Sequence, residues 1–152
     1  MDDQDRHADP PARLRTLVSW QASKVTTVAT RLTAARMPLA ARADFAVLAA
    51  LQEFGAMSQA ELGRRLGLDR NDVNGVLNRL QQHRHVDRRA DPADRRRNTV
   101  SITAGGLVRL EELQARADVV QGELVGALDE KEVSQLQQLL AKVLSGHPMQ
   151  QA

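Results

Sequence analysis

The central third of this chain combines two short helical patterns with a sudden change of hydrophobic period. Ser58 and Asp69 each precede a run with apolar residues at helical spacing, and Gly67 separates the two runs. The predicted inward positions are Leu62 and Leu66 in the first helix and Val73, Val76, Leu77 and Leu80 in the second. After residue 85 the pattern becomes extended, at Val86–Ala90 and Asn98–Ile102, with a charged, turn-rich loop between. Together these features predict a helix-turn-helix followed by a β-hairpin wing.

Helical patterns from both ends of the chain flank this centre. One long helix is predicted from Arg13 to just before Pro38, and a second over about residues 40–54, before Gly55. The predicted inner face of the second is Val47, Leu48, Leu51 and Phe54. After the hairpin, Thr103 begins another long helix, and Asp129 begins a last one with a capping box to Glu132.

The apolar stripes of these flanking helices are longer than one small winged domain can cover. They comprise Leu14, Leu17, Val18, Val25, Val28 and Leu32 in the first helix, Leu107, Leu110, Leu113, Ala117, Val120 and Leu124 after the hairpin, and Val133, Leu136, Leu139, Leu140 and Val143 in the last helix. A dimerisation bundle built from both chain ends would cover them, so we expect a homodimer.

The predicted fold is therefore all-α with a small two-stranded β-wing. The expected divisions are a disordered tail (1–11), a dimerisation helix (12–38), a winged helix-turn-helix domain (39–103), dimerisation helices (104–146) and a second tail (147–152). Within the winged domain, the recognition helix is expected at about 70–82 and the wing at about 86–102.

Composition narrows the class of protein. The 152 residues include two Phe, one Trp and no Tyr, so the core must be built from Leu, Val and Ala, which favours helices. The absence of Cys excludes disulfides, thiolate zinc sites and cysteine redox switches. No apolar run approaches the ~18 residues of a membrane span, and the acidic N-terminus does not resemble a secretory signal. We expect a soluble cytoplasmic protein without a cofactor.

Positive charge is concentrated in the middle of the chain. Residues 58–103 carry ten Arg and six acidic residues, a net charge of +4, whereas the rest carries 11 basic and 13 acidic residues, a net charge of −2. A basic centre between mildly acidic ends is typical of a nucleic-acid-binding module. The alternative is a solvated arginine-rich surface, since Arg outnumbers Lys 18 to three throughout the chain.

Several segments carry a resemblance to a known family. Residues 91–106, DPADRRRNTVSITAGG, resemble the wing pattern of the MarR family of winged helix-turn-helix transcriptional regulators, departing from it conservatively at Ile102. Residues 57–69 are similar to the family's first helix-turn-helix segment, and residues 45–48 to its second helix. Together they cover about Ala40 to Gly106. A helix-turn-helix match alone is weak, but followed by this wing string at this spacing it is specific.

The resemblance assigns roles to the wing. It implies that Arg96 enters the minor groove of double-stranded DNA and is braced by Asp94, while Arg95 and Arg97 contact phosphates. Cations at a wing tip suit this role, because a narrow A·T-rich minor groove concentrates negative potential. The alternative is a surface ion-pair cluster of little energetic value.

The predicted recognition helix offers residues that can contact bases. Arg can recognise guanine and Asn adenine, and both can instead bind phosphate. We expect base contacts from Arg70, Asn71 and Asn74, with Arg79 on phosphate; for each, a merely solvated role is the alternative.

At two positions of this helix the residue differs from the type that is common in the family. Asp72 replaces a small hydroxyl residue, and it can close a cap with Asp69 or accept a hydrogen bond from cytosine. Gly75 replaces a longer polar residue at a cost of ~1 kcal/mol in helix stability. It either permits close approach of the backbone to DNA or is neutral, so operator sequence is not predictable.

Other candidate sites are weaker. His83 and His85 with Asp87 have zinc-binding groups, but residues two apart do not converge from a helix, so no metal site is expected. In MarR-type proteins small ligands commonly bind between the dimerisation helices and the winged domain, where Trp20 is a speculative effector-binding residue; a packing role is the alternative. No catalytic motif is present, so we expect no enzyme.

The function expected from these features is regulation of transcription. We expect a homodimer, acting as a repressor, that binds a pseudo-palindromic operator and is released by a small-molecule effector of unknown identity. The alternative is a winged-helix protein-interaction module that has lost DNA binding.

Overall fold

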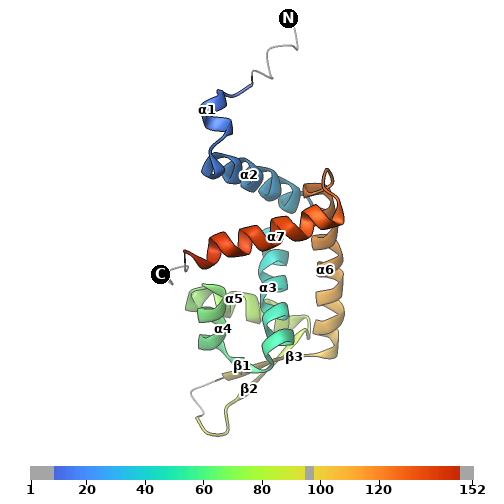
Figure 1. The fold of residues 1–152 in the computed structure, drawn as a ribbon. Coiled ribbons are helices and arrows are strands. Elements are labelled where there is room, and N and C mark those ends of the chain that lie inside the picture. The colour runs from blue at the N-terminus through green and yellow to red at the C-terminus, as the bar shows by residue number, and fades with distance from the viewer. Residues whose placement is uncertain (1–8, 95–97, 148–152) are drawn as a thin grey trace, which may run out of the picture.

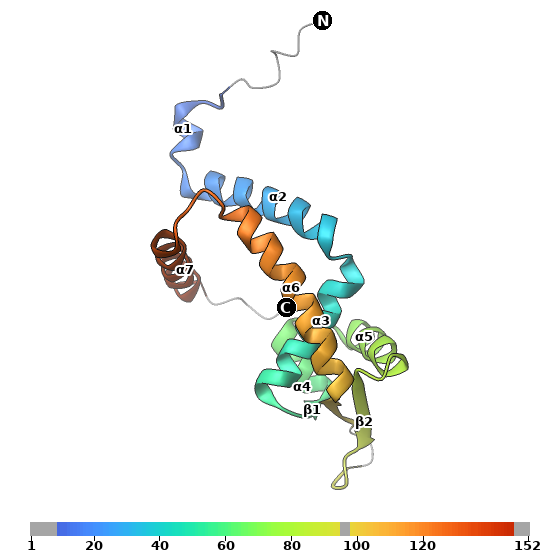
Figure 2. The same cartoon turned by 90° about the vertical axis from the view of Figure 1, so that its right-hand side faces the viewer.

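The computed structural model describes residues 9–94 and 98–147 as a helical protein with a small antiparallel sheet. In chain order the elements are α1 (Ala12–Arg15), α2 (Val18–Arg36), α3 (Leu39–Phe54), β1 (Met57–Ser58), α4 (Gln59–Leu66), α5 (Arg70–Gln82), β2 (Val86–Ala90), β3 (Asn98–Ile102), α6 (Ala104–Leu124) and α7 (Glu130–Ser145). The hairpin lies at one end of the molecule and α1 and α2 at the other, with α6 running between them (Figures 1 and 2). Within these residues no helix is both long and apolar enough to cross a membrane.

The helix-turn-helix is confirmed, and local signals define its limits. The Ser58 side chain accepts a hydrogen bond from the Glu61 amide at 3.2 Å, and that of Asp69 accepts one from the Asp72 amide at 2.8 Å. Gly67 ends α4 in the left-handed conformation, at φ +64°, which side chains rarely adopt. The stripe predicted for α5 is buried, with Val73, Leu77 and Leu80 at most 1% exposed.

The β-hairpin has the limits predicted from the sequence, and it gains a third strand. β2 and β3 pair antiparallel from Val86 opposite Ile102 to Ala90 opposite Asn98. β1 pairs with the other edge of β3, placing Met57 opposite Val100, so the strand order is β1-β3-β2. The expectation of two strands was incomplete, because a two-residue strand is too short to show an alternating pattern.

The core lies where α3, the helix-turn-helix, the hairpin and the first half of α6 meet. Val47, Leu48, Leu51, Leu62 and Leu113 are at most 1% exposed. Phe54, predicted on the inner face of α3, is instead 51% exposed. Its ring lies 4.3 Å from the guanidinium carbon of Arg65, so it packs beneath a cation at the surface.

The first predicted helix is broken. α1 ends at Arg15, and Leu17 has an extended backbone, with φ −80° and ψ 121°, before α2 begins. The Gln21 side chain donates a hydrogen bond to the Arg15 carbonyl at 2.8 Å. This bond joins α2 to the end of α1 across the break. Apolar spacing continues through this break, so periodicity alone did not reveal it.

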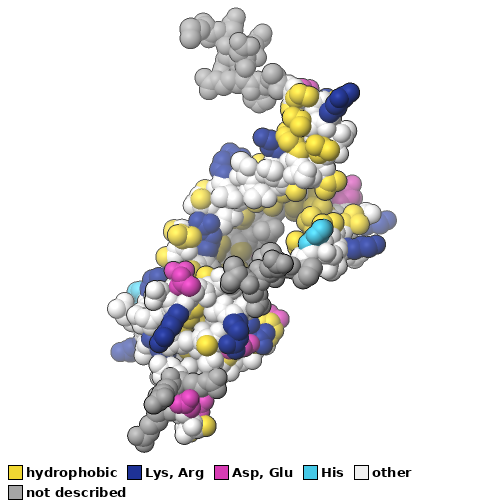
Figure 3. All heavy atoms as spheres, turned by 90° about the vertical axis from the view of Figure 1, so that its left-hand side faces the viewer, with side chains coloured by type: hydrophobic (Ala, Val, Ile, Leu, Met, Phe, Trp, Pro, Cys, Tyr) yellow, Lys and Arg dark blue, Asp and Glu magenta, His cyan; other side chains and the backbone are white. Residues whose placement is uncertain are grey.

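The helices from the two chain ends leave apolar surface uncovered in a single chain. Val18 and Val25 of α2 are 72% and 54% exposed, and Leu139 and Leu140 of α7 are 54% and 50% exposed. Neither α2 nor α7 contains a buried residue. Figure 3 shows the face of the molecule that lies on the left-hand side of Figure 1. On it, hydrophobic side chains gather on the N-terminal helical segment and in a hollow at mid-height.

Candidate nucleic-acid interface

The outer face of α5 lies opposite its buried stripe. Asn71, Gly75, Asn78 and Gln82 recur at helical spacing, and all four are exposed. Arg70 and Asn74, predicted to contact bases, are also exposed and flank this face. The structure thus brings Arg70, Asn71 and Asn74 onto one accessible side of α5, together with Asn78. Uncharged amides dominate it, whereas the Arg residues lie at its margins.

Arg79, the fourth residue predicted on α5, is engaged within the protein. Its Nε and Nη2 atoms donate to Oδ1 of Asp44, at 3.1 and 2.5 Å, and Nη2 also lies 3.3 Å from the Ala40 carbonyl. Asp44 is 7% exposed. Arg79 therefore ties α5 to α3, and a phosphate contact stays a prediction. Sequence reasoning missed Asp44, although its spacing of three and four residues from Val47 and Leu48 places a carboxylate on the inward stripe.

Arg88 connects the hairpin with α5. Its Nη2 atom donates to the Asn74 carbonyl at 3.3 Å, and burial lowers the pKa of its guanidinium. Because Arg88 is two residues after the buried Val86, it points to the same face of β2. That alternation was the available signal for this residue, which sequence reasoning did not single out. Arg88 positions the outer face of α5 relative to the wing.

The described part of the wing loop is a structured turn. The Asp91 carboxylate accepts a hydrogen bond from the Ala93 amide at 2.9 Å, and the Asp91 carbonyl accepts one from the Asp94 amide at 3.2 Å. Arg95, Arg96 and Arg97 lie outside the described residues. Their predicted contacts, and the bracing of Arg96 by Asp94, therefore stay predictions.

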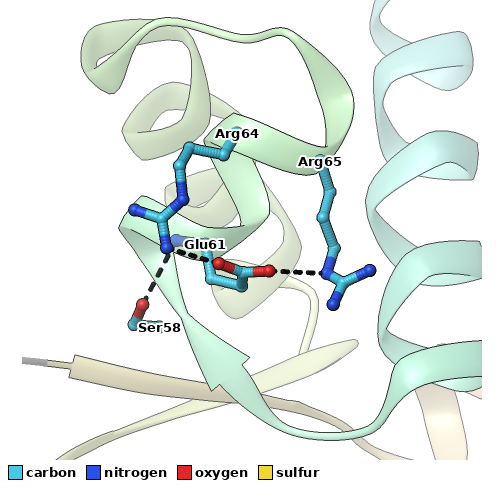
Figure 4. Close-up of polar contacts among 4 residues, drawn as sticks. All are labelled: Ser58, Glu61, Arg64 and Arg65. Atoms are coloured by element: carbon cyan, nitrogen blue, oxygen red, sulfur yellow. Dashed lines mark hydrogen bonds and ion pairs between the residues drawn. The ribbon is translucent and has the colours of Figure 1, made fainter.

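An arginine pair on α4 shares one carboxylate. Arg65 Nε lies 2.8 Å from Glu61 Oε1, and Arg64 pairs with the other oxygen (Figure 4). The hydrogen bond from Arg64 is the main cause that lowers the pKa of Glu61. The Ser58 side chain caps α4, whereas the Glu61 carboxylate binds these arginines rather than the Ser58 amide. Both cations remain accessible on the first helix of the helix-turn-helix.

A cleft of about 500 Å³ lies between the start of α3, the end of α5 and α6. Its lining residues are Pro38, Ala40, Ala41, Asp44, Arg79, His83, His85, Arg109, Glu112 and Arg116. The rings of His83 and His85 stack at 5.7 Å between centroids. The pKa of His85 is lowered mainly by burial and, second, by the nearby His83.

The structure does not bring Trp20 to this cleft. Trp20 is half-buried on α2, and the Nζ atom of Lys24 lies 5.2 Å from the centre of its ring. Within residues 9–94 and 98–147, no three His, Asp or Glu side chains are arranged to hold a metal ion. The effector role of Trp20 stays a prediction that this cleft does not support.

Comparison with known proteins finds a family that resembles the central part of the chain. The model of the MarR family matches residues 41–97, from α3 into the wing loop. The winged helix-turn-helix part of the chain is therefore similar to the MarR family. The chain is 31% identical over 101 residues to the transcriptional repressor NicR of Pseudomonas putida. That alignment covers 66% of this chain and 64% of NicR, which is less than two thirds of the relative's length.

Two solved structures extend the comparison over most of the length of this chain. Bordetella bronchiseptica BpsR, solved in a study of how 6-hydroxynicotinic acid regulates its DNA binding, is 27% identical with a TM-score of 0.68. That match covers 83% of this chain and 97% of BpsR. A mutant of Escherichia coli MarR complexed with operator DNA is also 27% identical, with a TM-score of 0.61, and covers 88% of this chain and 94% of that one.

Proposed function

We propose that this protein is a transcriptional repressor that binds double-stranded operator DNA as a homodimer. The observation that carries the proposal is the outer face of α5, an exposed row of Asn71, Gly75 and Asn78 opposite the buried stripe and beside the wing. A helix of this kind fits the major groove, where an amide side chain can donate one hydrogen bond to adenine N7 and accept another from adenine N6. Arg88 and the Asp44–Arg79 pair hold α5 in place, so the face is presented by a rigid support.

The wing supplies the second set of contacts. In this proposal Arg96 enters the minor groove, Asp94 braces it, and Arg95 and Arg97 contact phosphates. The family match reaches residue 97, and MarR of Escherichia coli is a structural neighbour solved on operator DNA. Phosphate contacts make binding dependent on salt, because each one releases a condensed counterion.

The dimer follows from the uncovered apolar surface of α2 and α7. A two-fold axis relating two such chains would place their α5 helices about 10 bp apart, in successive major grooves of a pseudo-palindrome. A monomer would contact only one half-site. The exposed leucines and valines of both terminal regions support this arrangement.

A small-molecule effector would act through the junction between α3, α5 and α6. The cleft there is lined by Arg109 and Arg116 and by the Asp44–Arg79 pair that holds α5. An anionic ligand bound beside these arginines would compete with Asp44 for Arg79. It would thereby change the position of α5 relative to α3. BpsR, a relative whose DNA binding is regulated by 6-hydroxynicotinic acid, makes an aromatic carboxylate the first class to screen.

Salt-dependent binding to the gene's own upstream DNA, against a scrambled fragment, tests the proposal. We expect selective binding that weakens steeply with salt, and a loss of at least about tenfold on Arg96→Glu. Lys131→Glu makes the same change of charge in the first turn of α7 and should retain affinity. Unchanged affinity of Arg96→Glu would refute the wing assignment. Binding of the wild-type chain without sequence preference would favour a protein-interaction module instead.

A further inference from the structure

The glycines of this chain differ in why the fold needs them. A Cβ at Gly106 would lie 2.1 Å from the His85 carbonyl oxygen, and one at Gly63 would lie 2.9 Å from that of Leu68. Both contacts are shorter than real Cβ atoms show, so these glycines allow the backbone of α6 and α4 to approach a neighbouring segment. At Gly75 a Cβ would meet nothing within 4 Å among residues 9–94 and 98–147. The fold itself has room for a side chain there.

Gly75 is also a poor residue for its place. It lies in the middle of the 13-residue helix α5, with no positive φ to justify it. A glycine inside a helix stabilises it less than alanine does, because more conformational freedom is lost on folding. The Arg88 guanidinium, which binds the neighbouring Asn74 carbonyl, does not occupy the space above Gly75. Among the residues that the structure describes, no contact accounts for the missing side chain.

The surroundings of Gly75 indicate what occupies that space. Asn71 and Asn78 precede and follow it by one helical turn, and Asn74 lies beside it, all exposed. The amide of Asn pairs with adenine through N6 and N7, and the thymine of that pair projects a 5-methyl group into the same groove. A helix with asparagines around a bare backbone position can therefore bind adenine and leave space for the neighbouring methyl.

We propose that Gly75 is the point where α5 approaches the base edges most closely, and that its missing side chain accommodates a thymine methyl group beside an adenine bound by Asn71, Asn74 or Asn78. The inference rests on the proposed function, since it requires α5 to enter the major groove. It makes Gly75 a residue that determines specificity without making a polar contact.

The experiment combines one protein change with one DNA change. DNA is first selected from a random pool by the wild-type chain, and each thymine of the selected half-site is then replaced by deoxyuridine, which lacks the methyl group. Gly75→Ala should weaken binding to the thymine DNA by about tenfold or more, and deoxyuridine at one position should restore most of that loss.

Gly122→Ala is the matched control. Gly122 is exposed and lies near the end of α6, and that end of the helix is remote from the hairpin (Figure 1). A Cβ at Gly122 also meets nothing within 4 Å in the described part of the chain. Both alanine variants should raise Tm by about 2–4 °C, because both remove a helix-interior glycine. Only Gly75→Ala should change DNA affinity.

Every other outcome refutes a specific part of the proposal. Equal affinity of Gly75→Ala and the wild type on thymine DNA would refute the close approach, and an equal loss on thymine and deoxyuridine DNA would refute the methyl contact. A lower Tm of Gly75→Ala would refute the premise that the fold has room at this position. Failure of the wild-type chain to select any sequence would instead refute the proposed function itself.

Discussion

His85 occupies a half-buried position between the end of α5 and β2, where its ring stacks on His83. Burial lowers the pKa of His85, with His83 and Arg109 as further causes, while Asp44 and Glu112 oppose them. The unfolded chain therefore takes up a proton at this residue at a higher pH than the folded chain does. Protonation at His85 thus favours unfolding once the pH falls through the ordinary histidine range, near 6.5.

The free energy of unfolding should therefore decrease as the pH falls from about 7 to about 5, and His85→Asn should make that decrease shallower. Urea denaturation at a series of pH values measures it. His147→Asn, close to the C-terminal end of the described chain, controls for the loss of a histidine as such. Parallel pH profiles of the wild type and His85→Asn would show that His85 contributes nothing to the pH dependence.

At the scale of elements, polar side chains connect α5 to a neighbouring element on each side. The Asp44–Arg79 pair joins it to α3, and Arg88 joins it to β2. Both connections lie on faces that otherwise pack apolar side chains. Because burying an unpaired charge is costly, the elements must dock so that each charged side chain meets its partner. The orientation of the outer face of α5 depends on them as much as on the core.

Asp44→Ala should lower the free energy of unfolding by about 2 kcal/mol, because Arg79 loses a charged acceptor in a partly buried place. The side chain of Arg79 is 35% exposed, so water can replace part of the interaction. The double variant Asp44→Ala with Arg79→Ala should lose less than the sum of the two single changes. Urea denaturation of all four proteins measures the coupling, and strict additivity would show that the pair is not coupled.

The elements that could be predicted from the sequence are those with local signals. Ser58, Asp69, Thr103 and Asp129 each cap the helix expected after them, and the limits of β2 and β3 follow from alternation. Pairing of β1 with β3, the ion pair of Asp44 with Arg79 and the hydrogen bond of Arg88 depend on how distant segments dock. No spacing rule gives these partners, although helical spacing places Asp44, and strand alternation places Arg88, on an inward face.

At the scale of the whole molecule, the uncovered apolar surface is the feature still to be accounted for. In α7 the side chains of Leu136, Leu139, Leu140, Val143 and Leu144 are 37–63% exposed, although they recur on one side of the helix. The Asp129 capping box and the Glu residues of the first turn stabilise α7 locally. A well-capped helix with a bare apolar face is the form expected of an element that packs against a second chain.

In the proposed homodimer, Leu140→Glu should shift the equilibrium from dimer to monomer, because it places a charge in the middle of the apolar face of α7. Light scattering coupled to size-exclusion chromatography measures the mass, and Gln138→Glu adds the same charge on the opposite side of the helix as a control. Operator affinity should fall together with dimerisation, since one chain contacts a single half-site. A Leu140→Glu variant that stays dimeric would place the interface elsewhere, and one that is monomeric yet binds the full operator with unchanged affinity would refute the two-fold arrangement.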